Sequence, residues 1–174
     1  MNTLAFYKGR TWLTAIALVT FTALAPCRKL QVGEYKVKAA FLLNFAKYVD
    51  WPQASNSGPL VIGVVGKDPF DGVLEGLAKD KLVNGRKLVV RHVAWDEAAS
   101  VHMLFVPQTE PAAGIQKVAK LPVVTVGESP SFNGGVINFR IVNDRVTFEI
   151  NASAAKANGL SISSQLLKLA AVVK

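Results

Sequence analysis

The residue types that most often bind metals or catalyse reactions are few in this chain and form no recognised motif. The two histidines, His92 and His102, each lie alone in a predicted strand, and Cys27 is the only cysteine. The chain has no H-x-x-x-H or H-E-x-x-H pattern and no cysteine set with the spacing of a zinc site. We therefore predict no metal site and no cofactor, and we interpret both histidines as structural.

The other side chains that could react are explained by local structure. Serines 161, 163 and 164 lie in no G-x-S-x-G turn, so we interpret them as helix caps and not as nucleophiles. Gly63, near the end of a predicted strand, and Gly66, just after it, precede a predicted helix, but they lack the Walker and Rossmann spacings. The carboxylates in loops and first helical turns match the helix dipole (Asp68, Asp71, Asp96 and Glu97). The sequence predicts no catalytic residue and no enzyme activity.

A different signal comes from the predicted hairpin over 136–150, where aromatic and charged side chains alternate near a sheet edge. Edge strands recruit partners unless they are covered. Two interpretations stay open: the phenylalanines belong to the core and the charges face solvent, or the arrangement forms a patch for another protein. On the second interpretation, the predicted partner-binding residues are Phe132, Phe139, Arg140, Arg145 and Glu149, together with Leu43 of the first helix.

That first helix is predicted over 34–52 and ends at Pro52, because the residue before a proline avoids the helical region. Its apolar residues recur in steps of three and four and predict one stripe that faces a core (Val37, Phe41, Phe45, Tyr48 and Val49). The opposite side carries Leu43 and several alanines, which indicates a second packing surface. This surface is either buried within the same domain or the contact of a dimer or partner.

The rest of the chain predicts an α/β fold with three layers, helix/sheet/helix. Continuous apolar runs separated by helical patterns predict a mostly parallel sheet covered on both faces, with strands over 60–65, 87–93, 101–106 and 123–126. A C-terminal antiparallel hairpin, with its turn at Asn143 and Asp144, extends this sheet at one edge. Asn151 caps a short helix, and a last helix is predicted over 166–173.

The N-terminal segment has the pattern of a secretory signal peptide. Lys8 and Arg10 precede an apolar run over 12–25, which is shorter than the ~20 residues of a membrane-spanning helix, and residues 23–25 read Ala-Leu-Ala. We predict a signal peptide over 1–25, a flexible mature N-terminus over 26–33 and a single domain over 34–174. Lipid attachment at Cys27 is one alternative; a free thiol fits better, because Pro26 stands where a lipoprotein box has a small residue.

The charge balance excludes one class of partner. The formal net charge is +8, from 20 basic and 12 acidic residues, and the basic residues are scattered. The chain has no dense basic run and no stripe of interleaved aromatic residues, so we expect no nucleic-acid binding. With one cysteine, the chain forms no internal disulfide.

Three segments, YKVKAAFLLNFAKYVDWP, HMLFVP and the long block VVTVGESPSFNGGVINFRIVNDRVTFEINASAAKANGLSISSQLLKLA, resemble the YfiR-like proteins of Gram-negative bacteria. The resemblance implies a non-enzymatic periplasmic repressor that acts on the periplasmic sensory domain of a membrane-bound diguanylate cyclase. It implies lower cyclic di-GMP, an effect on biofilm formation, and an outer-membrane lipoprotein that relieves repression. Val101 stands where the family often has a cysteine, so disulfide-linked redox control does not operate in this chain.

Two alternatives stay open at this point. The chain could be a periplasmic small-molecule binding module that uses the crevice at the carboxyl ends of the parallel strands, near 66–70 and 127–129. The second packing surface of the first helix could join two copies in a homodimer.

Overall fold

A computed structural model describes residues 25–52 and 57–174 of the chain. Nearly all of the predicted signal peptide lies outside these residues and stays a prediction. The elements are α1 (Ala25–Lys47), β1 (Val49–Asp50), β2 (Leu60–Val65), α2 (Val73–Ala78), β3 (Leu82–Val83), β4 (Arg86–Val93), the 3₁₀ helix η2 (Ala98–Ser100), β5 (Met103–Val106), the 3₁₀ helix η3 (Ala112–Val118), β6 (Val124–Gly127), β7 (Ile137–Val142), β8 (Arg145–Ile150), α3 (Ala152–Ala157), β9 (Ser161–Ile162), α4 (Ser164–Leu169) and β10 (Val172–Val173).

Eight of the strands form one sheet in the order β10-β8-β7-β6-β5-β2-β4-β3. The central pairs are parallel, and the β7–β8 hairpin and the β3–β4 pair are antiparallel. β1 and β9 form a separate two-stranded sheet. The predicted α/β fold, with a mostly parallel sheet extended by an antiparallel hairpin, is confirmed.

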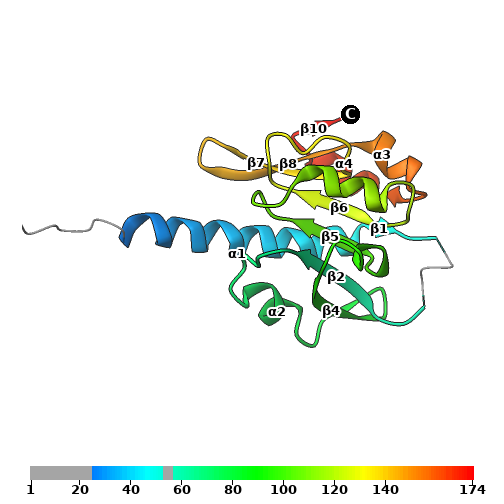
Figure 1. The fold of residues 1–174 in the computed structure, drawn as a ribbon, viewed down its shortest axis with the longest axis horizontal. Coiled ribbons are helices and arrows are strands. Elements are labelled where there is room, and N and C mark those ends of the chain that lie inside the picture. The colour runs from blue at the N-terminus through cyan, green and yellow to red at the C-terminus, as the bar shows by residue number, and fades with distance from the viewer. Residues whose placement is uncertain (1–24, 53–56) are drawn as a thin grey trace, which may run out of the picture.

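Two hydrophobic clusters lie on opposite faces of this sheet and define the three layers. Along β2, Ile62 and Val64 point into the larger cluster, whereas Val61 and Val65 point into the smaller one, as the alternation of a strand requires. The larger cluster is covered by the α-helices and the smaller one by η2 and η3. α1 runs along the sheet, and its N-terminal part continues past the body of the domain (Figure 1).

The first helix differs from the prediction at both ends. It begins at Ala25, so residues 26–33, which we expected to be flexible, are helical. These residues include Arg28, Lys29 and Leu30, which favour helix, and they continue the same helix without a break. The helix ends at Lys47 and not at Pro52, because Val49 and Asp50 pair with β9.

The buried face of α1 also differs from the predicted stripe. The residues that lie completely buried against the sheet are Ala39, Leu42, Phe45 and Ala46, whereas Val37 is 44% exposed. The buried face of α1 therefore follows Ala39, Leu42, Phe45 and Ala46, and Val37 lies at its margin. Leu43 is half-buried and packs against the larger cluster, which agrees with the interpretation of a helix covered on two sides within its own domain.

The C-terminal part confirms the hairpin and shortens the last helix. Asn143 and Asp144 have φ angles of 49° and 58°, as the two central residues of a type I′ turn require. α4 ends at Leu169, and the next residues form β10 beside β8, so the predicted helix over 166–173 is wrong in its second half. Within the described residues, none of the helices combines the length and hydropathy needed to cross a bilayer.

Candidate partner-binding groove

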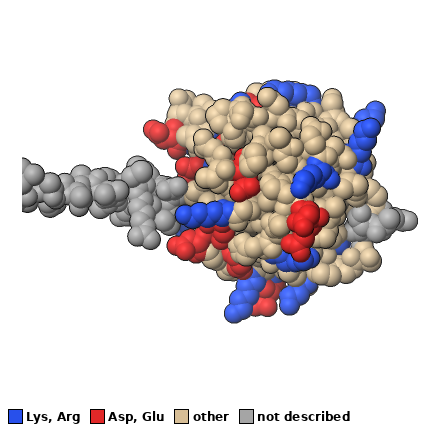
Figure 2. All heavy atoms as spheres, in the orientation of Figure 1, with Lys and Arg blue, Asp and Glu red and all other residues tan. Residues whose placement is uncertain are grey.

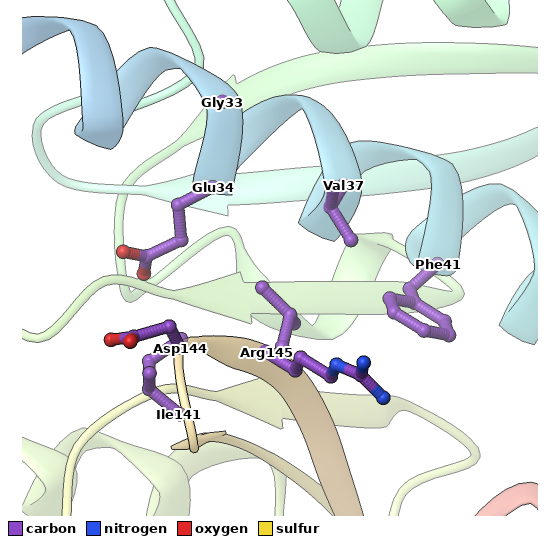
Figure 3. Close-up of a pocket in the computed structure, with 8 residues that line it drawn as sticks. Gly33, Glu34, Val37, Phe41, Ile141, Asp144 and Arg145 are labelled. Carbon is purple, nitrogen blue, oxygen red and sulfur yellow. The ribbon is translucent and has the colours of Figure 1, made fainter.

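A groove of about 770 Å³ lies between the N-terminal half of α1 and the tip of the β7–β8 hairpin. We call it the α1–hairpin groove, and Figure 3 shows the side chains that line it. α1 contributes Gly33, Glu34, Val37 and Phe41, and the hairpin contributes Ile141, Asp144, Arg145 and Val146. Two elements that are far apart in the sequence therefore form one concave surface.

The middle of the groove is apolar and accessible. Val37 is 44% exposed and Ile141 is 52% exposed, although both are aliphatic. Phe41 forms a firm wall, because its ring packs against the buried rings of Phe45 and Phe148, with centroids 5.9 and 5.4 Å away. The two aliphatic side chains and the aromatic wall together form an exposed apolar surface that another protein can cover.

The ends of the groove are charged, and the charges differ in sign. The carboxylates of Glu34 and Asp144 lie at one end, while the Arg145 guanidinium extends toward the Phe41 end (Figure 3). Elsewhere, on the face drawn in Figure 2, basic and acidic side chains are interspersed. The groove thus has the charged rim and apolar centre that a specific protein contact needs.

A buried ion pair fixes the α1 wall of the groove. The Lys38 ammonium lies 2.6 Å from Glu128 Oε2, both side chains are about 95% buried, and Lys38 also pairs with Glu34 of the groove. Glu128 Oε1 accepts hydrogen bonds from the Tyr35 hydroxyl and the Gln108 backbone N–H, each at 3.0 Å. Because Glu128 follows β6, these contacts attach α1 to the end of the central sheet.

The surroundings of Tyr35 change the pKa of its phenol. Burial, and after it the Glu128 carboxylate, raise the pKa of the Tyr35 phenol well above its ordinary value of 10.0. The phenol therefore stays protonated and keeps donating to Glu128. The ring also packs edge-on against Phe70, with centroids 5.5 Å apart, so Tyr35 links α1 to the segment that follows β2.

Two of the predicted partner-binding residues, Phe139 and Phe132, are buried. Phe139 is 1% exposed and lies in the larger cluster, as the core interpretation of the hairpin phenylalanines required. Phe132 is 7% exposed in the smaller cluster, where its ring covers Gly127 and Gly135 so closely that neither position has room for a side chain. Neither ring is available to a partner in this conformation.

The other predicted residues are divided among three places. Arg145 lines the α1–hairpin groove. Arg140 and Glu149 form an ion pair, with Arg140 Nε 3.3 Å from Glu149 Oε1, and strand alternation turns both away from the Phe139 face. Glu149 also accepts from Lys174, and this hydrogen bond, then the charge of Arg140, holds the pKa of the Glu149 carboxyl below its usual range. Leu43 lines a smaller hollow beside Leu82.

Val37 and Ile141, the apolar centre of the groove, were not singled out from the sequence. Val37 belonged to the stripe predicted to face the core. One feature of the sequence could have indicated the groove. Ile141 and Val142 are consecutive at the hairpin tip, so both faces of the strand are apolar at its end. Such a run violates the alternation expected of a half-exposed strand.

Two positions in the predicted crevice at the carboxyl ends of the parallel strands are in contact with other parts of the chain. The Glu110 carboxylate lies over Gly66, whose φ of +70° favours glycine, and Trp95 Nε1 donates to Glu110 at 3.1 Å. Glu128 is engaged by α1. Gly66 and Glu128 of the two segments predicted to form a small-molecule crevice are therefore engaged within the protein.

Comparison with known proteins places this fold and groove in a family. The family model DUF4154, described as YfiR/HmsC-like, matches residues 35–171, which include the hairpin wall of the groove and the Val37 and Phe41 part of its α1 wall. The chain belongs to the YfiR/HmsC-like family. The resemblance predicted from the sequence is thereby confirmed.

Other comparisons of this YfiR/HmsC-like chain add little. A solved structure described as an ABC domain in complex with L-Trp from Streptococcus pneumonia is 17% identical, with a TM-score of 0.45. The similarity covers 66% of this chain, which spans about half, 55%, of that chain. No curated protein matches the chain.

Proposed function

We propose that this YfiR/HmsC-like protein is a periplasmic regulator that binds the periplasmic sensory domain of an inner-membrane diguanylate cyclase and lowers cyclic di-GMP. The observation that carries the proposal is the α1–hairpin groove, an exposed apolar surface with charged ends. Membership in the YfiR/HmsC-like family supports a regulatory role over a catalytic one. Biofilm formation is the cellular output expected to follow.

The groove indicates what its partner presents. An apolar side chain at the centre would cover Val37 and Ile141, which are each about half exposed. Complete burial of such side chains contributes about 1.5–3 kcal/mol, so covering the remaining half contributes roughly 1 kcal/mol at each position. A basic group of the partner would face Asp144, beside Glu34, which already pairs with Lys38, and an acidic group would face Arg145.

Two other partners compete for the same surface. An outer-membrane lipoprotein that binds the groove would displace the cyclase and relieve repression, and a second copy of this chain would occupy it in a homodimer. The lipoprotein and the second copy would each bind the groove variants more weakly than the wild type. Identifying the protein that is bound distinguishes these partners from the cyclase.

The test uses the purified mature protein and the periplasmic domain of each diguanylate cyclase of the same organism. We expect one of these domains to bind the wild-type protein. The same domain should bind the Ile141→Asp variant with at least ten-fold lower affinity. Leu169→Asp is the matched control, because Leu169 is an exposed aliphatic residue that does not line the groove. Binding of no cyclase domain, or equal binding by both variants, would count against the proposal.

A further inference from the structure

Three side chains that commonly bind metal ions meet on the face of β4 beside α2. Asp68, Glu75 and His92 each offer one ligand atom, and these atoms all lie within 4.8 Å of one another. His92 Nε2 is 3.1 Å from Glu75 Oε1. Among the described residues, these three form the one group of at least three His, Cys, Asp or Glu side chains that could hold a metal ion.

The topology of the sheet, and not a local motif, brings the three residues together. β2 and β4 are parallel neighbours in which Val64 is paired with His92, so the loop after β2 passes close to His92. Asp68 lies in this loop, where its Oδ1 accepts a hydrogen bond from the Phe70 backbone N–H at 2.8 Å. Glu75 lies in the first turn of α2, which follows. The spacing 68/75/92 matches no metal motif, which is why the sequence predicted none.

The charges of this group are incompletely balanced. One oxygen of each carboxylate lies within 4.8 Å of the other and of a His92 ring nitrogen, and His92 Nε2 is 3.1 Å from Glu75 Oε1. Oε2 of Glu75 is buried and accepts no hydrogen bond there. The Glu75 side chain as a whole is 38% exposed, so its carboxylate is open to a cation from solvent.

We propose that Asp68, Glu75 and His92 form a binding site for a divalent transition-metal ion, with Zn²⁺ as the best match. Two carboxylates and one imidazole are a donor set that Zn²⁺ accepts, whereas Mg²⁺ and Ca²⁺ prefer oxygen ligands alone. Ligand atoms about 2.0–2.2 Å from a tetrahedral ion lie about 3.4 Å apart. Binding would therefore change the 3.1 Å Glu75–His92 separation little, and would require the other ligand atoms to lie closer together than the 4.8 Å limit of the group. Water would complete the coordination, because the His92 side chain is 55% exposed.

The experiment is a calorimetric titration of zinc chloride into the full mature chain, untagged, treated with chelator and carrying Cys27→Ser to remove the only thiol. We expect one ion per chain, with affinity at least ten-fold lower in His92→Ala and in Glu75→Gln. Zinc should also raise the melting temperature of the parent protein but not of these variants, because an ion that binds only the native state stabilises it. Asp71→Asn, an exposed carboxylate in the same loop, is the matched control and should bind zinc normally.

Cobalt chloride gives an independent measurement, since bound Co²⁺ acquires visible absorption that the His92→Ala variant should lack. His92 is exposed enough for this variant to fold, and circular dichroism checks that it does. The proposal is overturned if the parent protein shows no saturable zinc binding. It is equally overturned if folded His92→Ala and Glu75→Gln bind zinc as tightly as the parent.

Discussion

Replacement of Lys38 by methionine tests whether the buried ion pair attaches α1 to the sheet. Methionine keeps most of the length and apolar surface of the lysine stem but removes its charge. The Glu128 carboxylate would then be about 95% buried without its cation, and Glu34 would lose the same partner. The three groups together carry one net negative charge in the wild type and two in the variant.

The magnitude follows from the burial of both partners. Removal of one member of a buried ion pair typically costs 3–5 kcal/mol, because the other charge stays buried and unpaired. The Tyr35 hydroxyl and the Gln108 N–H still donate to Glu128 in the variant, so we expect the lower end, about 3 kcal/mol. A domain with a total stability of about 5–15 kcal/mol would lose a large fraction of it.

Urea unfolding followed by tryptophan fluorescence measures this change in the free energy of unfolding. Lys36→Met is the matched control, because Lys36 is exposed on the same helix and its replacement should change stability by no more than about 0.5 kcal/mol. Adding Glu128→Gln to Lys38→Met should recover much of the loss, since it removes the unpaired charge. A loss below about 1 kcal/mol in Lys38→Met would show that the ion pair does not anchor α1.

Three further predictions concern the same fold. The raised pKa of Tyr35 means that its stabilising contribution is complete below pH 10 and is lost as the pH rises above 10; Tyr35→Phe should flatten this loss in alkaline unfolding experiments. The lowered pKa of Glu149 acts in the opposite direction, because its contribution is present above about pH 4.5 and is lost as the pH falls below it; Lys174→Met should reduce this acid dependence. Phe139→Ala should cost about 3–5 kcal/mol in urea unfolding, and a variant as stable as the wild type would contradict the buried position of Phe139.

Much of the fold could be predicted because the strands of a covered parallel sheet have a strong signal. The run LVIGVV of β2 is buried at every position, and the hairpin turn at Asn143 and Asp144 has the residue types that positive φ angles require. Such features depend on a few neighbouring residues. They are therefore visible in one sequence.

Features that depend on distant contacts were missed. Val172 and Val173 are β-branched residues after a helix, and only the presence of β8 beside them makes them a strand. The buried face of α1 depends on which side of the helix meets the sheet. Periodicity alone placed Val37 on that side, although its side chain is 44% exposed.

The candidate sites were predicted less well for the same reason. The hairpin was identified as the region of interest, but only Arg145 among the six predicted residues lines the α1–hairpin groove. The groove needs two elements about 100 residues apart, and the Asp68, Glu75 and His92 group needs the parallel pairing of β2 and β4. Neither arrangement has a local spacing that a motif could capture.

Cellular cyclic di-GMP is the measurement that tests the proposed function most directly. A strain that lacks this gene is complemented with the wild type, with Ile141→Asp, or with the control Leu169→Asp, and periplasmic protein levels are matched by immunoblotting. We predict that deletion raises cyclic di-GMP, that the wild type and Leu169→Asp restore the lower level, and that Ile141→Asp does not. Unchanged cyclic di-GMP on deletion, or full restoration by Ile141→Asp, would contradict repression through the α1–hairpin groove.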